Sequence, residues 1–210
     1  MAEVGAELVK GLREKTGAGI MDCKRALQAT GGDAGKAIDW LREKGLARAA
    51  QKAGRAASEG VVTSYVHAGG RVGVLLELNC ETDFVARTAE FTALAHDLAM
   101  QVAASGPRWV RVEEVPAELV QHEREVLARQ AAAEGKPPRV VEQMVEGRLR
   151  KFYAENCLLA QAYIKDSDRT VESVVKEAIA RLGENIVPRR FARFELGAGV
   201  QSGEGEAAQG

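Results

Sequence analysis

The hydrophobic period of the chain changes near Gly60, and this change constrains the fold more than any other feature. Before Gly60, apolar residues recur every three or four positions, which predicts amphipathic helices. After Gly60, the apolar residues Val72, Val74, Leu76 and Leu78 alternate along the chain, which predicts a strand with one buried face. The sequence therefore predicts an α+β protein in which helices precede a small antiparallel sheet.

The first 45 residues read as three short helices separated by glycine turns. The predicted helices cover residues 3–16, about 20–30 and 33–45, with Asp33 as the N-cap of the third and Gly45 closing it. They predict a compact helical domain over residues 1–45, followed by a solvated, basic helical linker over residues 46–59. The residues expected on the inner faces are Val4, Leu8, Val9, Leu12, Ile20, Cys23, Ala26, Leu27, Ala34, Ala37, Ile38 and Leu41.

Residues 60–197 carry the signals of the α+β core. Two strands, 61–66 and 72–80, flank the turn residues 68–70 and predict a β-hairpin. Thr88 and Thr170 are expected to cap two helices, and a pair of helices is expected around residues 119–127 and 141–152. Short strands are expected near residues 158–164 and 190–196, and residues 198–210 read as a flexible tail.

Composition excludes several classes of protein. Lys and Arg number 29 against 30 Asp and Glu, so the net charge of −1 argues against a protein that binds nucleic acid directly. No apolar run approaches the roughly 18 residues that span a bilayer, and no secretory signal opens the chain. Three scattered cysteines are typical of reduced thiols, so we expect a cytoplasmic protein without membrane contact.

Motifs for catalysis are lacking. The sequence contains no phosphate-binding GxxxxGK[ST] or GxGxxG pattern and no HExxH metal motif. Its histidines, His67, His96 and His122, fall in different predicted elements, and Cys23 and Cys80 lie on apolar faces. We therefore expect no catalytic residue, no metal and no cofactor.

The segment Glu81-Thr82-Asp83-Phe84-Val85 is the most informative short stretch. It joins a buried strand to a helix, and connections of this kind run over the surface. Phe84 has two interpretations: it folds back into the core while Asp83 caps the helix, or it projects from the surface. In the second case residues 82–85 form a wedge, with Phe84 buried in a partner and Asp83 engaging polar groups of that partner.

Several motifs, in order, resemble the bacterial elongation factor Ts family. Residues 12–27 read LREKTGAGIMDCKRAL, and residues 73–86 read GVLLELNCETDFVA. Residues 32–45, 134–148 and 193–195 match as well, so the similarity runs from about Val4 to Gly197. The chain has one hairpin unit where the family's long form has two, so it resembles the short form.

The resemblance implies a guanine-nucleotide exchange factor for elongation factor Tu without catalytic chemistry of its own. It implies that Thr82, Asp83, Phe84 and Val85 enter the partner's G domain and dislocate Mg²⁺, so that GDP leaves and GTP can bind. It also implies a ubiquitin-associated-like N-terminal bundle and a homodimer that serves two partner molecules.

Further contacts follow from the same resemblance. Leu12, Ile20 and Met21 match family positions that pack on the partner's G domain. Leu12 fits the core of the bundle equally well, whereas Ile20 and Met21 are adjacent and cannot both point inward. The hairpin tip, with His67 and Gly69, is a weaker candidate for contact with another domain of the partner.

Two other functions stay open on the sequence. A ubiquitin-associated-type adaptor would bind its partner without changing nucleotide affinity. A cysteine hydrolase would lose its activity on thiol alkylation, although the buried setting expected for Cys23 and Cys80 argues against it.

Overall fold

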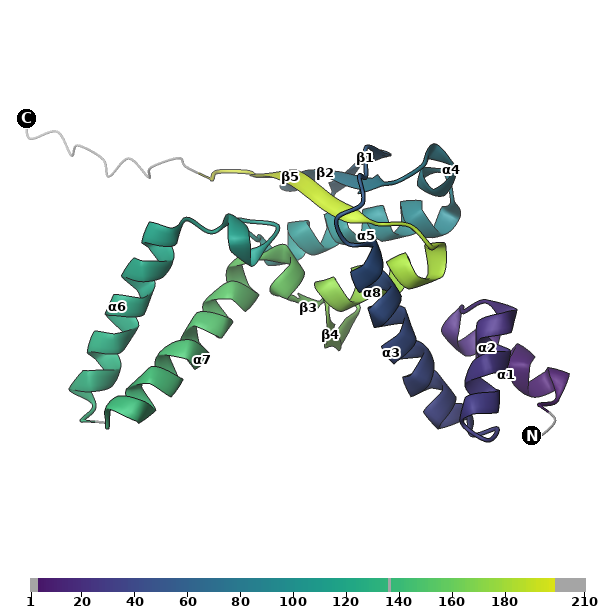
Figure 1. Ribbon diagram of the computed structural model, residues 1–210. Coiled ribbons are helices and arrows are strands. Elements are labelled where there is room, and N and C mark those ends of the chain that lie inside the picture. The colour runs from purple at the N-terminus through teal and green to yellow at the C-terminus, as the bar shows by residue number, and fades with distance from the viewer. Residues whose placement is uncertain (1–3, 136, 199–210) are drawn as a thin grey trace, which may run out of the picture.

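The structure, a computed structural model, describes residues 4–135 and 137–198. A helical bundle lies at one end, a core with a three-stranded sheet lies in the middle, and a long helical hairpin projects from the other end (Figure 1). Helices and strands combine as the sequence predicts for an α+β protein.

The bundle consists of α1 (Ala6–Thr16), α2 (Ile20–Ala29) and the first part of α3 (Ala34–Lys52). Gly17 ends α1 with a left-handed φ of 66°, and the Asp33 side chain caps α3 by accepting a hydrogen bond from the Lys36 amide at 3.0 Å. These features confirm the three predicted helices. Leu8, Ile20 and Ile38, which were expected to face inward, are exposed, and Trp40 packs on the bundle core instead.

Helix α3 does not end at Gly45, so the predicted boundary there is wrong. It continues to Lys52 and lies against α8 (Val171–Leu182). A Cβ atom at residue 45 would lie 3.1 Å from the Cβ atom of Ala180 on α8, and Ala49 is buried. Gly45 therefore permits a close helix crossing, and residues 46–52 continue α3 with Ala49 buried and most of the other side chains exposed.

The sheet consists of β1 (Glu59–Val66), β2 (Val72–Cys80) and β5 (Val187–Glu195), antiparallel in the order β1-β2-β5. Ser64, Leu75 and Ala192 share one row across the three strands. The β1–β2 hairpin confirms the prediction. On the inner face, Val74, Leu76 and Leu78 are buried as their alternation predicts.

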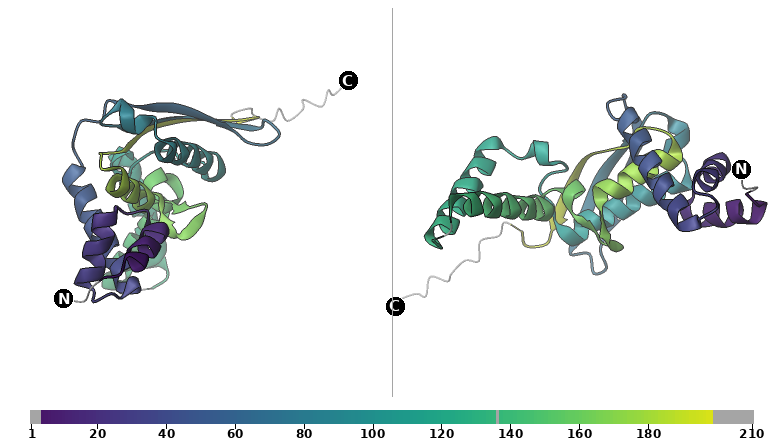
Figure 2. Two further views of the ribbon diagram at one scale, coloured as in Figure 1. Left: turned by 90° about the vertical axis from the view of Figure 1, so that its right-hand side faces the viewer. Right: turned by 60° about the horizontal axis from the view of Figure 1, so that its bottom comes forward.

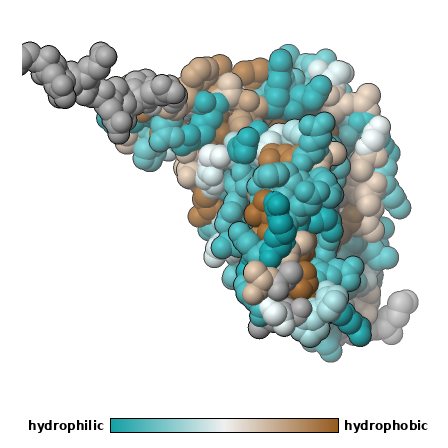
Figure 3. All heavy atoms as spheres, turned by 90° about the vertical axis from the view of Figure 1, so that its left-hand side faces the viewer, coloured by the Kyte–Doolittle hydropathy of each residue, from teal (hydrophilic) through white to brown (hydrophobic). Residues whose placement is uncertain are grey.

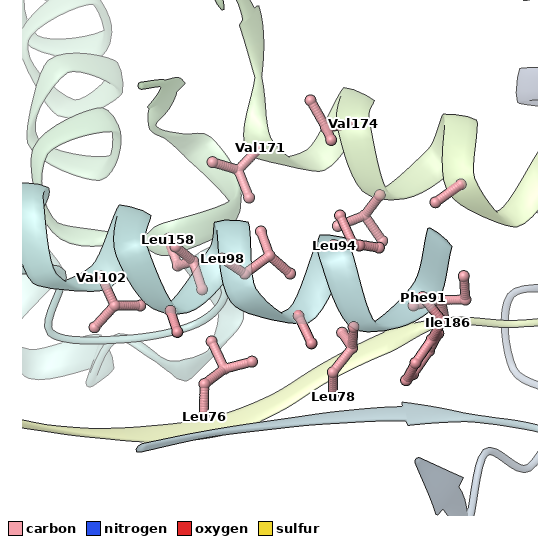
Figure 4. Packing of buried hydrophobic residues seen from close by; sticks show 14 of the residues in the cluster. Leu76, Leu78, Phe91, Leu94, Leu98, Val102, Leu158, Val171, Val174 and Ile186 are labelled. Carbon is pink, nitrogen blue, oxygen red and sulfur yellow. The ribbon is translucent and has the colours of Figure 1, made fainter. Parts of the chain in front are cut away.

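One helix, α5 (Ala89–Ser105), fills the space between the sheet and α8. Thr88 caps α5, as predicted, by accepting a hydrogen bond from the Phe91 amide at 3.2 Å. In Figure 4, Leu76 and Leu78 of β2 point toward α5, while Val171 and Val174 of α8 lie on its other side. This three-layer core anchors the end of β2 and the start of α5.

The helical hairpin comprises α6 (Ala117–Ala133) and α7 (Pro138–Asn156), as predicted, although Lys136 between them lies outside the described residues. The strand expected near residues 158–164 is only β3 (Ala162–Tyr163), which pairs with an unpredicted strand, β4 (Asp166–Thr170). Thr170 caps α8 by accepting from the Ser173 amide. Of the predicted tail, only Ala198 is described.

The outer face of the sheet is apolar and exposed. Within the described residues no helix covers it, and the left view in Figure 2 shows the sheet along the upper side with α5 beneath. Val66, Gly73 and Phe194 form one row, and Leu75 lies in the next. In Figure 3, part of the hydrophobic surface lies along the same upper side of the molecule. The exposed apolar side chains of this face are Val62, Val66, Leu75 and Phe194.

Separately, none of the helices in the described ranges has the length and apolar character that crossing a membrane requires.

Candidate functional site

The predicted wedge, residues 82–85, folds as a cap residue followed by the single-turn helix α4 (Asp83–Ala86) between β2 and α5. Thr82 is in an extended conformation, and its hydroxyl accepts a hydrogen bond from the Val85 amide at 3.5 Å. The connection that the sequence predicts as a loop is therefore one helical turn, and Thr88, not Asp83, caps the following helix.

The wedge points its side chains in two directions. Val85 packs against the main core and Ala86 is buried, so this side of α4 anchors the turn. Phe84 is 82% exposed, the largest exposed fraction among the large hydrophobic residues that the structure describes. The interpretation that Phe84 folds into the core of its own chain is therefore wrong.

Asp83 also faces outward. Its carboxylate pairs with Arg87 one helical turn later, with 2.9 Å between the charged atoms, and half of its side chain is exposed. Exposed pairs at this spacing contribute only about 0.3–0.5 kcal/mol. Asp83 can therefore exchange Arg87 for another polar partner at little cost.

Residues from distant parts of the chain hold the segment that leads into the wedge. The Glu184 carboxylate accepts hydrogen bonds from the backbone amides of Glu81 and Thr82, and the Glu81 carboxylate accepts one from the Asn185 amide at 2.7 Å. This last bond lowers the pKa of Glu81, with Arg55 adding a smaller effect. Sequence analysis missed these contacts because about a hundred residues separate the two segments.

Cys80, the last residue of β2, is a buried structural thiol. Its sulfur donates a hydrogen bond to the Thr82 carbonyl at 3.1 Å. Burial raises the pKa of the thiol, and the charge of Glu184 raises it further, so the reactive thiolate form is disfavoured. The candidate site thus contains no activated cysteine.

The three bundle residues from the sequence analysis fall into two groups. Leu12 is 2% exposed and belongs to the bundle core, so the structure favours the core interpretation for it. Ile20 and Met21, at the start of α2, are 55% and 63% exposed, so both face outward. Helices α1, α2 and α4 lie at the same end of the molecule, opposite the α6–α7 hairpin (Figure 1).

The hairpin tip lies away from the wedge. His67 and Gly69 occupy the turn before Val72, at the opposite end of β2 from Cys80. At about 3.4 Å per residue, β2 separates the two ends by roughly 30 Å. The turn itself needs glycine, since Gly69 has a φ of 88°, and His67 is exposed beside the Tyr65 hydroxyl. The structure thus brings the wedge and the bundle to one end, but not the hairpin tip.

A hollow of about 310 Å³ lies between the bundle and α8. Charged residues line it, but several of them pair with one another: Arg48 contacts Asp22 at 2.8 Å, and Arg169 contacts Glu177 at 2.5 Å. In residues 4–135 and 137–198, no three His, Cys, Asp or Glu side chains gather in a way that could hold a metal ion. We assign no ligand to this hollow.

Comparisons with known proteins agree on one family. The family described as Elongation factor TS matches residues 33–198. Elongation factor Ts of Syntrophomonas wolfei is 63% identical over 198 residues, which cover 94% of this chain and 92% of that protein. Elongation factor Ts of Desulforamulus reducens is 59% identical over 208 residues, covering 99% of this chain and 96% of that protein.

The matches include the helical bundle, the sheet and the wedge, and they place the chain among the translation elongation factors. Within that class, the chain belongs to the elongation factor Ts family.

Proposed function

We propose that this protein is a guanine-nucleotide exchange factor for elongation factor Tu and acts in the cytoplasm. It binds the GDP-bound form, dislocates Mg²⁺ and promotes release of GDP so that GTP can bind. The observation that carries this proposal is the exposure of Phe84 on a short helix anchored to the core, in a chain of the elongation factor Ts family.

The mechanism needs no bond-making by this chain. An exchange factor binds the nucleotide-free partner more tightly than the GDP-bound partner, and by linkage GDP weakens the factor's binding by the same ratio. Burying a phenylalanine side chain contributes roughly 1.5–3 kcal/mol. If Phe84 is buried only in the nucleotide-free complex, this free energy stabilises that complex relative to the GDP-bound one. It thereby weakens the binding of GDP to the partner.

Asp83 is the polar arm of the wedge. Mg²⁺ neutralises the phosphates of a bound nucleotide, so moving the ion out of place weakens GDP binding. The Asp83 carboxylate competes for the groups that orient the ion's ligands, and Thr82 and Val85 hold the wedge by its cap and its buried side.

The helical bundle supplies the second contact. We assign α1–α3 to the ubiquitin-associated type, with Ile20 and Met21 packing on the G domain of the partner and Leu12 supporting them from the bundle core. The hairpin tip at His67 and Gly69 is a further contact, with another domain of the partner.

Two copies of the chain form a homodimer through the outer face of the sheet. That face exposes Val62, Val66, Leu75 and Phe194, while its charged pair, Glu77 and Arg190, is satisfied within the chain at 2.6 Å. A two-fold dimer uses the same patch on both copies, and two sheets packed face to face bury such side chains in a shared layer about 10 Å thick.

The direct test is release of fluorescently labelled GDP from elongation factor Tu. Phe84→Ala should slow release by roughly 10- to 100-fold, the equivalent of burying one phenylalanine. Val140→Ala, which trims an exposed apolar residue on α7, is the matched control and should release GDP at the wild-type rate. Unchanged release with Phe84→Ala would reject the wedge.

The same assay distinguishes the adaptor alternative. A ubiquitin-associated-type adaptor would bind elongation factor Tu through Ile20 and Met21 and leave GDP release at the spontaneous rate. Binding without acceleration by the wild-type protein would therefore favour that function.

A further inference from the structure

Glu184 makes the most concentrated set of contacts to the wedge. It lies in the turn between α8 and β5, directly after Gly183, which caps α8. One carboxylate oxygen, Oε2, accepts from the amides of Glu81 and Thr82 at 3.1 and 3.0 Å, and the other, Oε1, accepts from the Thr82 hydroxyl at 2.6 Å. A single side chain therefore holds two consecutive residues at the base of the wedge.

The contact is reciprocal. The Glu81 carboxylate accepts from the Asn185 amide, and the Asn185 side chain donates to the Arg55 carbonyl at 2.8 Å. Arg55, from the segment after α3, lies 3.6 Å from Glu81. Lys52 at the end of α3 also donates to the Gly183 carbonyl. Residues 52–55, 81–82 and 183–185 thus meet at the base of the wedge. Within the last of these segments, Glu184 is the residue whose side chain contacts Thr82.

The wedge needs such an anchor because a single helical turn cannot stabilise itself. Forming one turn fixes several backbone angles in return for very few hydrogen bonds. The Thr82 hydroxyl accepts from the Val85 amide and donates to Glu184 at the same time. A hydroxyl that donates to a charged acceptor is polarised into a better acceptor itself, so Glu184 strengthens the N-cap of α4.

We propose that Glu184 is a positioning residue for nucleotide exchange: its carboxylate fixes the backbone and cap of the wedge, and thereby the direction in which Phe84 projects. This proposal rests on the exchange function proposed above. Glu184 needs no contact with the partner to act in this way, because its three hydrogen bonds all go to Glu81 and Thr82.

The test compares GDP release by wild-type, Glu184→Ala and Glu184→Gln proteins over a range of factor concentrations. Glu184→Ala should lower the maximal rate roughly tenfold, since small errors in positioning cost much of a rate. The concentration for half-maximal rate should change less than about twofold, because the bundle contact is intact. Glu184→Gln keeps one acceptor oxygen, so its maximal rate should lie between those of the wild-type and Glu184→Ala proteins.

Glu172→Gln is the matched control. Glu172 lies in the first turn of α8, at the end of the helix far from Glu184, and pairs with Lys176 at 2.6 Å. This variant should keep both the maximal rate and the half-maximal concentration, and thermal unfolding of all variants checks that each is folded.

Thr82 supplies a second, independent readout. Thr82→Val removes the hydroxyl that Glu184 holds, whereas Thr82→Ser keeps it and should give a higher maximal rate than Thr82→Val. The double variant Thr82→Val, Glu184→Ala should be slowed by less than the product of the two single effects, since both changes remove the hydrogen bond between Thr82 and Glu184. In NMR spectra, the amide signals of Glu81 and Thr82 should shift in Glu184→Gln while the signals of α8 stay in place.

The outcomes separate the two proposals. Wild-type maximal rates in both Glu184 variants, together with slow release by Phe84→Ala, would overturn the role of Glu184 and leave the exchange function standing. Wild-type release by Phe84→Ala would overturn both. A Glu184→Ala protein that does not fold leaves Glu184→Gln and the Thr82 pair to decide.

Discussion

Phe84 and Phe91 lie close together in the sequence but occupy opposite environments: Phe84 is 82% exposed on α4, and Phe91 is completely buried at the start of α5. Thr82 and Thr88 cap the two helices in the same way, so the local structure around both residues is similar. The difference arises from what each side chain meets: Phe91 packs between the sheet and α8, whereas Phe84 meets solvent.

This pair predicts a clear difference in stability. Phe91→Ala should lower the free energy of unfolding by about 3–5 kcal/mol, since it leaves a cavity in the core. Phe84→Ala should change it by less than about 0.5 kcal/mol, as expected for an exposed side chain. Urea unfolding measures both. A large loss of stability in Phe84→Ala would mean that its ring packs on its own chain.

The proposed dimer face predicts a change in molar mass. Charged side chains at Leu75 and Phe194 would be buried without partners between two sheets, which is costly. The double variant Leu75→Lys, Phe194→Lys should therefore be a monomer by light scattering, while wild type is a dimer. Val140→Lys, on the α6–α7 helical hairpin, is the control and should stay a dimer. A monomeric wild-type protein would contradict the proposal.

The ion pair between α2 and α3 predicts a loss of stability in acid. Arg48 donates two hydrogen bonds to Asp22, which with Arg25 lowers the pKa of Asp22 from 3.8 to about 2. In the unfolded chain Asp22 has its ordinary pKa. The ion pair therefore stabilises the fold above about pH 4, and this contribution is lost as the pH falls toward 2.

The measurement is the free energy of unfolding of wild-type and Asp22→Asn proteins between pH 6 and 2. The wild-type protein should be more stable near pH 6, and the two should converge toward pH 2. Ala50→Ser, an uncharged change on the exposed side of α3, should run parallel to wild type. A constant difference between wild type and Asp22→Asn would show that the charge of Asp22 contributes nothing.

The cysteines should react slowly in the folded protein. Cys23, Cys80 and Cys157 are all buried, and burial, with Glu114 and Glu113 nearby, raises the pKa of the Cys157 thiol to about 11. Thiol reagents at pH 8 should therefore modify the native protein far more slowly than the unfolded protein. Alkylation should leave GDP release unchanged. Rapid reaction with loss of activity would revive the hydrolase alternative.

Sequence patterns predicted the elements whose causes are local. Asp33, Thr88 and Thr170 cap helices as expected because a cap side chain bonds an amide only three residues away. The β1–β2 hairpin was predictable because alternation and a glycine turn both act over a few residues. The position of the wedge, between the end of β2 and the start of α5, followed from the same signals.

The tertiary structure decided which residues contact one another. Gly45 reads as a helix end, yet the approach of Ala180 on α8 makes it a crossing point inside α3. Phe84 could have faced either way, and Glu184 carries no local signal of its link to Thr82. Caps and periodicity depend on neighbours along the chain, so the amino-acid order determines them. Burial and anchoring depend on surfaces that distant segments present to each other, and these exist only once the chain has packed.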